Sequence, residues 1–333
     1  MSTDFNGKQV FVTGADGFIG SHLVERLVRE GASVKALTYY NSWNSIGWLS
    51  NIPQSILNSV EVLRGDIRDA EFIHKAIRNC EYVFHLSSLI GIPYSYSSPR
   101  SYLDTNITGA LNVLEGCRNS SSLLRLLHTS TSEVYGTAQT VPISEDHPLV
   151  GQSPYSATKI GADKLVESYY HSFALPVVTA RPFNTFGPRQ TARAVIPTIA
   201  SQLLSGCSSI QLGALTPTRD FTYVLDTARA MCSLIGCDSA EGQVVNIGTG
   251  LEWSIEETAR ILMEIVGVET PITCDNERVR PKNSEVNRLI ADNSRITSMT
   301  NWRPEHSFRE GLEETVDWIK QNLHHFEPTD YSV

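Results

Sequence analysis

Two side chains four positions apart, Tyr155 and Lys159 in "SPYSATKIGADKL", have the types and spacing needed for proton transfer. On a helix this spacing places both on one face. A tyrosine at its usual pKa of about 10 is a poor base at neutral pH, and lowering that pKa by about three units takes roughly 4 kcal/mol. A lysine ammonium about 4 Å away supplies about that much at an effective dielectric constant of 20. The pair therefore predicts a tyrosine base activated by the lysine.

A second polar group stands upstream in "TSTSEVYG", residues 129 to 136, which follows the apolar run "LLRLLH". Thr131 has a hydroxyl suited to hydrogen-bonding the same substrate oxygen as Tyr155. Ser132 and Glu133 follow directly. Glutamate has a reference pKa near 4.3, so Glu133 is ionised at neutral pH and can act as a base. Thr131, Tyr155 and Lys159 together predict removal of a hydroxyl proton while a hydride leaves the same carbon.

A hydride acceptor is predicted from the glycine-rich stretch "VTGADGFIGSHL", which carries Gly14, Gly17 and Gly20. It joins an apolar, β-branched run (9–14) to a stretch with helical spacing (20–31). Glycines allow the backbone to approach a pyrophosphate, which the N–H groups of the following helix hold. A tight turn without a ligand would also use glycines, but the strand–turn–helix position favours dinucleotide binding. We include Phe18 and Ile19 of this motif among the predicted cofactor contacts.

The choice of cofactor rests on the segment after the second predicted strand, "SVKALT". It ends in Thr38, Tyr39 and Tyr40, where a carboxylate would normally hold the adenosine ribose. No arginine stands there to bind a 2′-phosphate, and we therefore expect NAD rather than NADP. Asp66 and Ile67 in "GDIRD" follow the third strand and are predicted to reach the adenine, although a strand-end cap is an equally good interpretation of Asp66.

The elements that must position these residues alternate between strand and helix. Short apolar runs read as strands, with amphipathic helices between most of them: "QVFVTG", "SVKALT", "VEVLRGD", "YVFHLSS", "LLRLLHTS" and "LPVVTARP". This alternation predicts an α/β fold of the Rossmann type, a doubly wound parallel sheet with helices on both faces. We expect residues 1–181 to bind NAD, with part of 220–250 returning to that domain. Residues 182–333, with helices near 254–266 and 307–323, are expected to form mainly a smaller α/β substrate-binding domain.

Composition narrows the class of protein. The chain has 333 residues, of which 41% are hydrophobic and 19% charged, as in soluble globular proteins. Its net charge of -9 argues against a nucleic-acid partner. The six cysteines form no CxxC pair and no zinc-like spacing, so no metal site is predicted. Neither a signal sequence nor an apolar run of about 18 residues is present, so we expect a cytoplasmic protein without a membrane anchor.

A series of ordered motifs resembles the extended short-chain dehydrogenase/reductases, the NAD-dependent epimerase/dehydratase family acting on nucleotide sugars. The motifs run from about residue 8 to about residue 323: "TGADGFIG", "GDIRD", "FHLSS", "STSEVYG", "SPYSATK", "RPFNTFGPRQ", "RDFTYVLD", "NIGTG" and "RPKNSEVNRLIAD". Within the family, "STSEVYG" looks like the 4,6-dehydratases, especially the GDP-mannose type. "YYNSWNSIGWL" and "GPRQTARAVIPTI" are similar to dehydratases of UDP-N-acetylglucosamine-like donors in legionaminic-acid-type pathways.

The resemblance implies a mechanism for these residues. Tyr155 takes the O4 proton as hydride passes from C4 to NAD, and the resulting 4-ketone makes the C5 hydrogen acidic. Glu133 removes that hydrogen, water leaves from C6, and the hydride returns there to give a 4-keto-6-deoxy sugar. The glucose-type dehydratases have an aspartic acid where this chain has Ser132. Either Glu133 shuttles the proton itself or Ser132 relays it through water.

The resemblance also implies binding residues and a homodimer. Asn184 and Arg219 are expected to contact the substrate diphosphate and Arg280 the nucleotide end, with Arg189 and Arg193 as further candidates. Arginine suits this because its planar fork makes paired bonds to phosphate oxygens. The nicotinamide side is expected to be lined by Leu86, Ser87, Ser88 and Asn106. The stretches 105–117 and 155–173 could pair with those of a second copy, although core packing gives the same periodicity.

Three alternatives remain. UDP-glucuronate decarboxylases of the same family also carry a Ser-Glu after the threonine, but their tyrosine segment usually differs from "SPYSATK". Simple 4-epimerases usually lack an acid where Glu133 stands. A non-catalytic NAD-binding sensor or scaffold is the alternative of another class, and the intact Thr131, Tyr155 and Lys159 argue against it.

Overall fold

The centre of the molecule is a parallel sheet of seven strands, in the order β11-β6-β5-β4-β1-β2-β3. This computed structural model describes residues 3–278 and 284–327. The strands are β1 (Gln9–Thr13), β2 (Ser33–Tyr39), β3 (Val60–Gly65), β4 (Tyr82–His85), β5 (Arg125–Thr129), β6 (Val177–Pro182) and β11 (Val244–Ile247). The first six coincide with the six apolar runs, so the predicted doubly wound α/β fold is confirmed.

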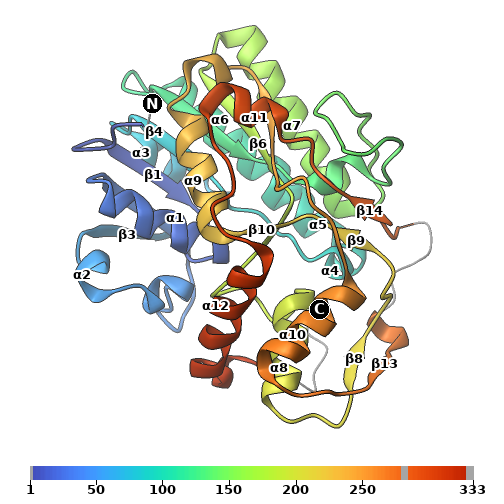
Figure 1. Cartoon of the computed structure of the whole chain (residues 1–333). Helices are drawn as coiled ribbons and strands as arrows, with labels where there is room; N and C mark the ends of the chain where they lie inside the picture. The colour runs from blue at the N-terminus through green and yellow to red at the C-terminus, as the bar shows by residue number, and fades with distance from the viewer. Residues whose placement is uncertain (1–2, 279–283, 328–333) are drawn as a thin grey trace.

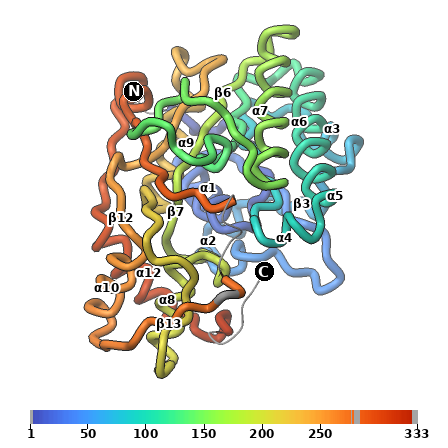
Figure 2. The backbone as a smooth tube through the Cα atoms, turned by 90° about the vertical axis from the view of Figure 1, so that its right-hand side faces the viewer, coloured from blue at the N-terminus to red at the C-terminus, as the bar shows by residue number. Residues whose placement is uncertain are grey.

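Helices cover both faces of this sheet (Figures 1 and 2). One face carries α1 (Phe18–Arg29), α9 (Val224–Ile235) and α11 (Ser294–Thr300), and the other carries α3 (Ala70–Ile77), α6 (Gly109–Arg118) and α7 (Pro154–Phe173). Strand β1 shows why both faces are apolar. Val10 and Val12 pack with Leu23 of α1, whereas Phe11 packs with Ile73 of α3, because successive side chains of a strand point to opposite faces.

The helix α7 begins at a strong sequence signal. Ser153 caps it by accepting the N–H of Ser156, whose hydroxyl accepts the N–H of Ser153 in return, and Pro154 occupies the first helical position. Tyr155 therefore lies in the first turn, at the end of the helix nearest the carboxyl ends of the strands. On the same face of the sheet, α6 continues from α4 (Ile92–Ser97), α5 (Pro99–Tyr102) and the π-helical turn η2 (Leu103–Thr108).

A second part of the chain lies below the sheet in Figure 1 and has its own apolar core. Its helices are α8 (Val195–Leu204), α10 (Ile255–Val266) and α12 (Phe308–Gln321). Three small sheets join them: β7 (Asn184–Phe186) with β10 (Phe221–Tyr223); β9 (Thr218–Arg219) with β12 (Trp253–Ser254) and β14 (Arg288–Leu289); and β8 (Ile210–Leu212) with β13 (Ile272–Cys274). The helices expected near 254–266 and 307–323 are confirmed; α8 and the short strands were not predicted.

The remaining short elements are α2 (Gln54–Leu57) and the 3-10 turns η1 (Gly47–Asn51), η3 (Ser132–Tyr135), η4 (Asp238–Ala240), η5 (Asn276–Arg278) and η6 (Leu323–His325). The chain crosses between its two parts more than once, since α9 packs on α1 and β11 pairs with β6 in parallel register. No helix in the described ranges is both long and apolar enough to cross a membrane. Nor do those ranges hold a cluster of three His, Cys, Asp or Glu side chains suited to a metal ion.

We expect Gly20→Ala to destabilise the fold. A Cβ at this position would lie 2.1 Å from the carbonyl oxygen of Gly14, a contact that forces the turn to move. Overpacking of this kind typically lowers the free energy of unfolding by about 1–3 kcal/mol, more than alanine gains by its helix propensity. Urea denaturation measures the effect. Gly91→Ala is the control, because its nearest neighbours would lie at 3.5 Å; equal stability of the two variants would contradict the argument.

Candidate active site

Three of the predicted catalytic residues gather at the carboxyl end of β5. Thr131 caps η3 there, and its hydroxyl oxygen accepts the N–H of Glu133 at 3.2 Å. The same hydroxyl hydrogen-bonds to the phenol of Tyr155 and favours its ionisation, whereas the negative charge of Glu133 opposes it. Both effects require proximity, so the structure brings Thr131, Glu133 and Tyr155 together. Ser132, which stands between Thr131 and Glu133 in the chain, has a buried side chain.

Burial shifts the pKa values of Tyr155 and Lys159 in opposite directions. Burial raises the pKa of Tyr155 well above its usual value, and burial also lowers the pKa of Lys159 to about 8. The Lys159 ammonium donates to the carbonyl oxygen of Thr129 at 2.7 Å. At Tyr155 loss of hydration outweighs the hydrogen bond from Thr131. Activation of the phenol by the Lys159 charge stays a prediction.

A buried carboxylate, Asp163, fixes the helix that carries these two residues. It lies one turn beyond Lys159 on α7, and one of its oxygens accepts from Ser130 Oγ and Arg181 Nη2, each at 2.9 Å. Its other oxygen is 3.3 Å from His128 Nε2. Burial opposes ionisation of Asp163, but His128 and Arg181 together hold its pKa below the usual value. The carboxylate thus joins α7 to β5 and β6.

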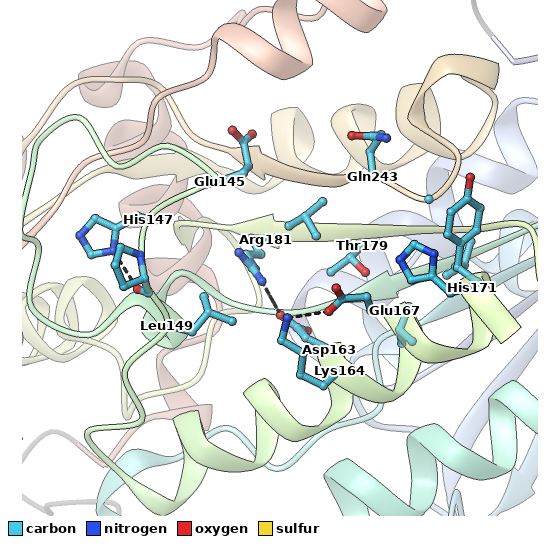
Figure 3. Close-up of a pocket in the computed structure, with 16 residues that line it drawn as sticks. Glu145, His147, Leu149, Asp163, Lys164, Glu167, His171, Thr179, Arg181 and Gln243 are labelled. Atoms are coloured by element: carbon cyan, nitrogen blue, oxygen red, sulfur yellow. Dashed lines mark hydrogen bonds and ion pairs between the residues drawn. The ribbon is translucent and has the colours of Figure 1, made fainter.

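An open cavity of about 340 Å³ lies on the far side of this ion pair, between α7, β6, β11 and residues 145–149 (Figure 3). Asp163 and Arg181 form part of its wall, together with Lys164, Glu167 and His171. None of the predicted catalytic residues lines it. The cavity is therefore separate from the site around Tyr155.

The glycine turn packs tightly against the loop after β4. Gly14 has a φ of +67°, and a Cβ there would lie 2.9 Å from the backbone nitrogen of Ser87. Thr13 fixes this loop, since its hydroxyl oxygen accepts the N–H groups of Leu86 and Ser87, each at 3.0 Å. A turn that only glycine can occupy, at the start of α1, is the backbone cradle that a dinucleotide pyrophosphate requires. These residues fit a dinucleotide cofactor.

Asn106 was predicted to line the nicotinamide side, but its amide is fully used within the protein. Its oxygen accepts from Ser88 Oγ and from the N–H of Leu89, each at 2.9 Å. Its nitrogen donates to the carbonyl oxygen of Leu89 and to Thr158 Oγ1, each at 3.1 Å. The structure thus gives Asn106 a positioning role: it ties the loop after β4 to α7, next to Lys159.

The other predicted cofactor contacts are Phe18 and Ile19 at the start of α1, and Asp66 and Ile67 after β3. Phe18 and Ile19 pack against the core of the second part of the chain, and Ile67 is buried on the α6 face of the sheet. Their side chains are therefore occupied by apolar packing. Asp66 is bound by Arg68, with Nε to Oδ1 at 2.9 Å and Nη2 to Oδ2 at 2.5 Å, which favours the cap interpretation. The cofactor contacts of these four residues remain predictions.

One predicted substrate arginine points towards the catalytic group. A Cβ added at Gly91 would lie 3.5 Å from Arg193 Nη1. The positive charge of Arg193 favours ionisation of Tyr102, against the effect of burial. The ring of Tyr102 in turn meets that of Tyr155 edge-on, with centroids 6.3 Å apart. Arg193 is thus placed near the predicted reaction centre.

Asn184 and Arg219 lie on the small sheets. Asn184 Oδ1 is buried and has no hydrogen-bond partner among the described residues. Arg219 donates to the carbonyl oxygen of Thr218 at 2.9 Å and to Glu285 at 3.2 Å. A phosphate would therefore have to share Arg219 with Glu285.

Arg189 makes contacts within the protein, and its predicted substrate contact stays a prediction. It is buried, and its Nη2 lies 2.8 Å from Glu25 Oε2 and 2.9 Å from His22 Nδ1 on α1. Burial lowers the pKa of His22 to about 3, so this imidazole is neutral and accepts the bond. The guanidinium fastens the segment after β7 to α1. Arg280 lies outside the described residues.

Three positioning residues were missed by sequence reasoning: Thr13, Asp163 and Asp220. Asp220 is fully buried and accepts from the N–H and hydroxyl of Thr249 and from the N–H groups of Gly250 and Ala291. Only Asp163 left a signal in the sequence, because it follows Lys159 by four positions on one helix face. The partners of Thr13 and Asp220 come from distant parts of the chain.

Comparison with known proteins places this geometry in a family. The family model described as GDP-mannose 4,6 dehydratase matches residues 11–315. This chain belongs to that family. The predicted membership of the NAD-dependent epimerase/dehydratases is thereby confirmed, and the chain is an enzyme of that family.

Its relatives catalyse more than one reaction. The chain is 32% identical to the low-salt glycan biosynthesis protein Agl12 of Haloferax volcanii, over 93% of this chain and 97% of that one. It is 30% identical to a dTDP-glucose 4,6-dehydratase of an Actinoplanes strain, over 94% and 98%. The crystal structure of a Bacillus cereus UDP-glucuronic acid 4-epimerase with UDP-glucuronic acid and NAD superposes with a TM-score of 0.86, at 29% identity, over 94% and 99%.

We expect Asp163→Asn to lower the free energy of unfolding by about 3–5 kcal/mol, because it leaves the buried Arg181 guanidinium without its counter-charge. Guanidinium chloride denaturation at neutral pH measures the loss. Lys164→Gln is the matched control: the neighbouring Lys164 is exposed and pairs with Glu167 on the surface, where an ion pair contributes at most about 1 kcal/mol. Similar losses in the two variants would refute the anchoring role of Asp163.

Proposed function

We propose that this protein is an NAD-dependent nucleotide-sugar 4,6-dehydratase that converts UDP-N-acetylglucosamine to a UDP-4-keto-6-deoxy sugar. The observation that carries the proposal is the position of Glu133, whose half-buried carboxylate acts electrostatically on Tyr155 and follows Thr131 in the cap of η3. A 4-epimerase needs no second base, whereas elimination across C5 and C6 does. The site offers that base next to the proton acceptor.

The residues divide the reaction between them. Thr131 hydrogen-bonds the substrate O4, and Tyr155 removes the O4 proton while the C4 hydrogen leaves as hydride. Bound NAD supplies the acceptor for that hydride, the positive charge that favours ionisation of neighbouring acids, and the hydride that returns to C6. Glu133 removes the C5 proton, which the 4-ketone has made acidic, as the C6 hydroxyl departs as water. Lys159 supports Tyr155 with its positive charge.

The proton that the C6 hydroxyl needs must come from a group that has one to give. Ser132 at its ordinary pKa is too weak an acid, and it is buried beside Glu133 in sequence. We propose that Glu133 passes on the proton it has taken from C5, with Ser132 as a relay. The substrate diphosphate is proposed to bind between Asn184, Arg193 and Arg219. Within the described ranges the buried Asn184 oxygen has no hydrogen-bond partner, and both arginines lie on the second part of the chain.

The proposed reaction and its alternatives differ in the mass of the product. Purified protein is incubated separately with UDP-N-acetylglucosamine, UDP-glucuronate, GDP-mannose and dTDP-glucose. Loss of water supports dehydration, loss of carbon dioxide supports decarboxylation, and an isomer of unchanged mass supports 4-epimerisation. Epimerisation is the second candidate, because the Bacillus cereus relative catalyses it. No turnover of any donor would contradict the proposed function.

A homodimer and a cytoplasmic location are also proposed. The two stretches expected to pair with a second copy form α6 and α7, which lie side by side on one face of the sheet (Figure 2). Exposed Leu103, Leu111 and Phe173 on or next to these helices offer apolar area for such a contact.

We expect Glu133→Gln to stop elimination but not oxidation. The amide keeps the shape of the side chain and cannot accept the C5 proton, so water loss should fall by about 10²- to 10⁴-fold. Reduced nicotinamide, seen by its near-ultraviolet absorbance, should still form on adding substrate. Glu167→Gln on the exposed surface of α7 is the control and should behave as the native protein does. Undiminished water loss from Glu133→Gln would exclude Glu133 as the base.

The rate should fall as the pH rises through about 8, because Lys159 then loses its proton. Burial lowers the folded-state pKa of Lys159, so the side chain is fully protonated only below about pH 8. Above that pH its positive charge is lost and no longer supports Tyr155. A profile of kcat/KM against pH measures this alkaline limb. In Lys159→Met the remaining activity should be low and should lack the limb; a native limb in that variant would assign it to another group.

A further inference from the structure

The end of β2 is supplied with a carboxylate by the glycine turn. The segment that follows this strand has no acid of its own where a ribose-binding carboxylate is normally found. Asp16 lies between Gly14 and Gly17, and its Oδ2 accepts the N–H of Tyr39, the last residue of β2, at 2.9 Å. A carboxylate therefore lies at the end of β2, although it belongs to the glycine turn and not to the segment after β2.

The position of Asp16 is fixed from several sides. The N–H of Trp48 donates to the Asp16 carbonyl oxygen at 3.0 Å, and a Cβ at Gly47 would lie 2.5 Å from that oxygen. The loop after β2 thus packs on the glycine turn. Among the residues that the structure describes, two N–H groups act on the carboxylate, those of Tyr39 and of Asp16 itself. A carboxylate accepts about four hydrogen bonds, so acceptor positions remain for two ribose hydroxyls.

The guanidinium of Arg68, near the end of β2, is already bound by a carboxylate. Arg68, whose charge is influenced by Tyr39 at the end of β2, makes a two-point contact with Asp66. An arginine so placed would otherwise be suited to a phosphate. Because Asp66 pairs with Arg68, this positive charge is not available to bind a 2′-phosphate.

We propose that Asp16 selects NAD over NADP by binding the adenosine ribose hydroxyls and repelling a 2′-phosphate, and that Asp66 supports this selection by occupying Arg68. The inference rests on the proposed dinucleotide site and names the residue that decides its specificity. Asp16→Asn tests it, because the amide oxygen can still accept the Tyr39 N–H while the negative charge is lost. The fold of the turn is thereby kept.

The experiment measures binding and requires no turnover. Bound nucleotide is removed, and the native protein and variants are titrated with NAD and with NADP by calorimetry. The native protein should bind NAD at least about 100-fold more tightly than NADP, and this ratio should fall about tenfold or more in Asp16→Asn. Adding Asp66→Asn, which frees Arg68, should lower the ratio further. Asp238→Asn on exposed η4 makes the same chemical change elsewhere and should leave the ratio unchanged.

The outcomes separate this inference from the proposed function. A native NAD preference that Asp16→Asn leaves intact would overturn the role of Asp16 but not the dehydratase. Equal weakening of both cofactors in Asp16→Asn would show that Asp16 serves only the turn, and would also overturn it. If the native protein binds neither cofactor, both proposals fail.

Discussion

The site depends on one buried carboxylate. Asp163 is held by Arg181, Ser130 and His128, which stand on β6, after β5 and on β5, while Asp163 itself is on α7. A lone buried charge would be costly, so these elements must remain together for the charge to stay paired. Because Tyr155 and Lys159 belong to the same helix, the ion pair sets their position relative to the end of β5, where Thr131 and Glu133 stand.

A second constraint is the close backbone packing around the glycine turn, which leaves no room for side chains at two positions. Gly14 leaves no room for a Cβ beside Ser87, and Gly20 leaves none beside Gly14. These close approaches hold the backbone of the glycine turn close to the loop after β4 at the start of α1, where a pyrophosphate would bind. The Thr13 hydroxyl holds the loop after β4 in place, and Asn106 joins that loop to α7. Cofactor cradle and catalytic helix are therefore parts of one hydrogen-bonded unit.

A buried carboxylate with several hydrogen-bond donors also holds the second part of the chain together, as Asp163 does for α7. Asp220 is a fully buried carboxylate that collects N–H groups from residues 249, 250 and 291. It stands between Arg219 and Phe221, so the predicted phosphate ligand and the aromatic core of α12 are positioned together. Arg189 adds a link from this part to Glu25 on α1. Arg189, a predicted substrate residue, thus links the second part of the chain to α1.

By itself the sequence determined the doubly wound sheet and the family, because apolar period, glycine spacing and the order of motifs are local features that need no partner. It also predicted the reactive set Thr131, Glu133, Tyr155 and Lys159, since their spacing along one strand end and one helix face is local too. Only the tertiary structure decided which partner each polar or charged side chain has within the protein. It gave Arg189 and Asn106 partners within the protein, placed the Lys159 ammonium on the Thr129 carbonyl oxygen, and brought Asp16 to the end of β2. Hydrogen bonds and burial join residues far apart in the chain, and they set each pKa and each partner in ways that no local spacing records.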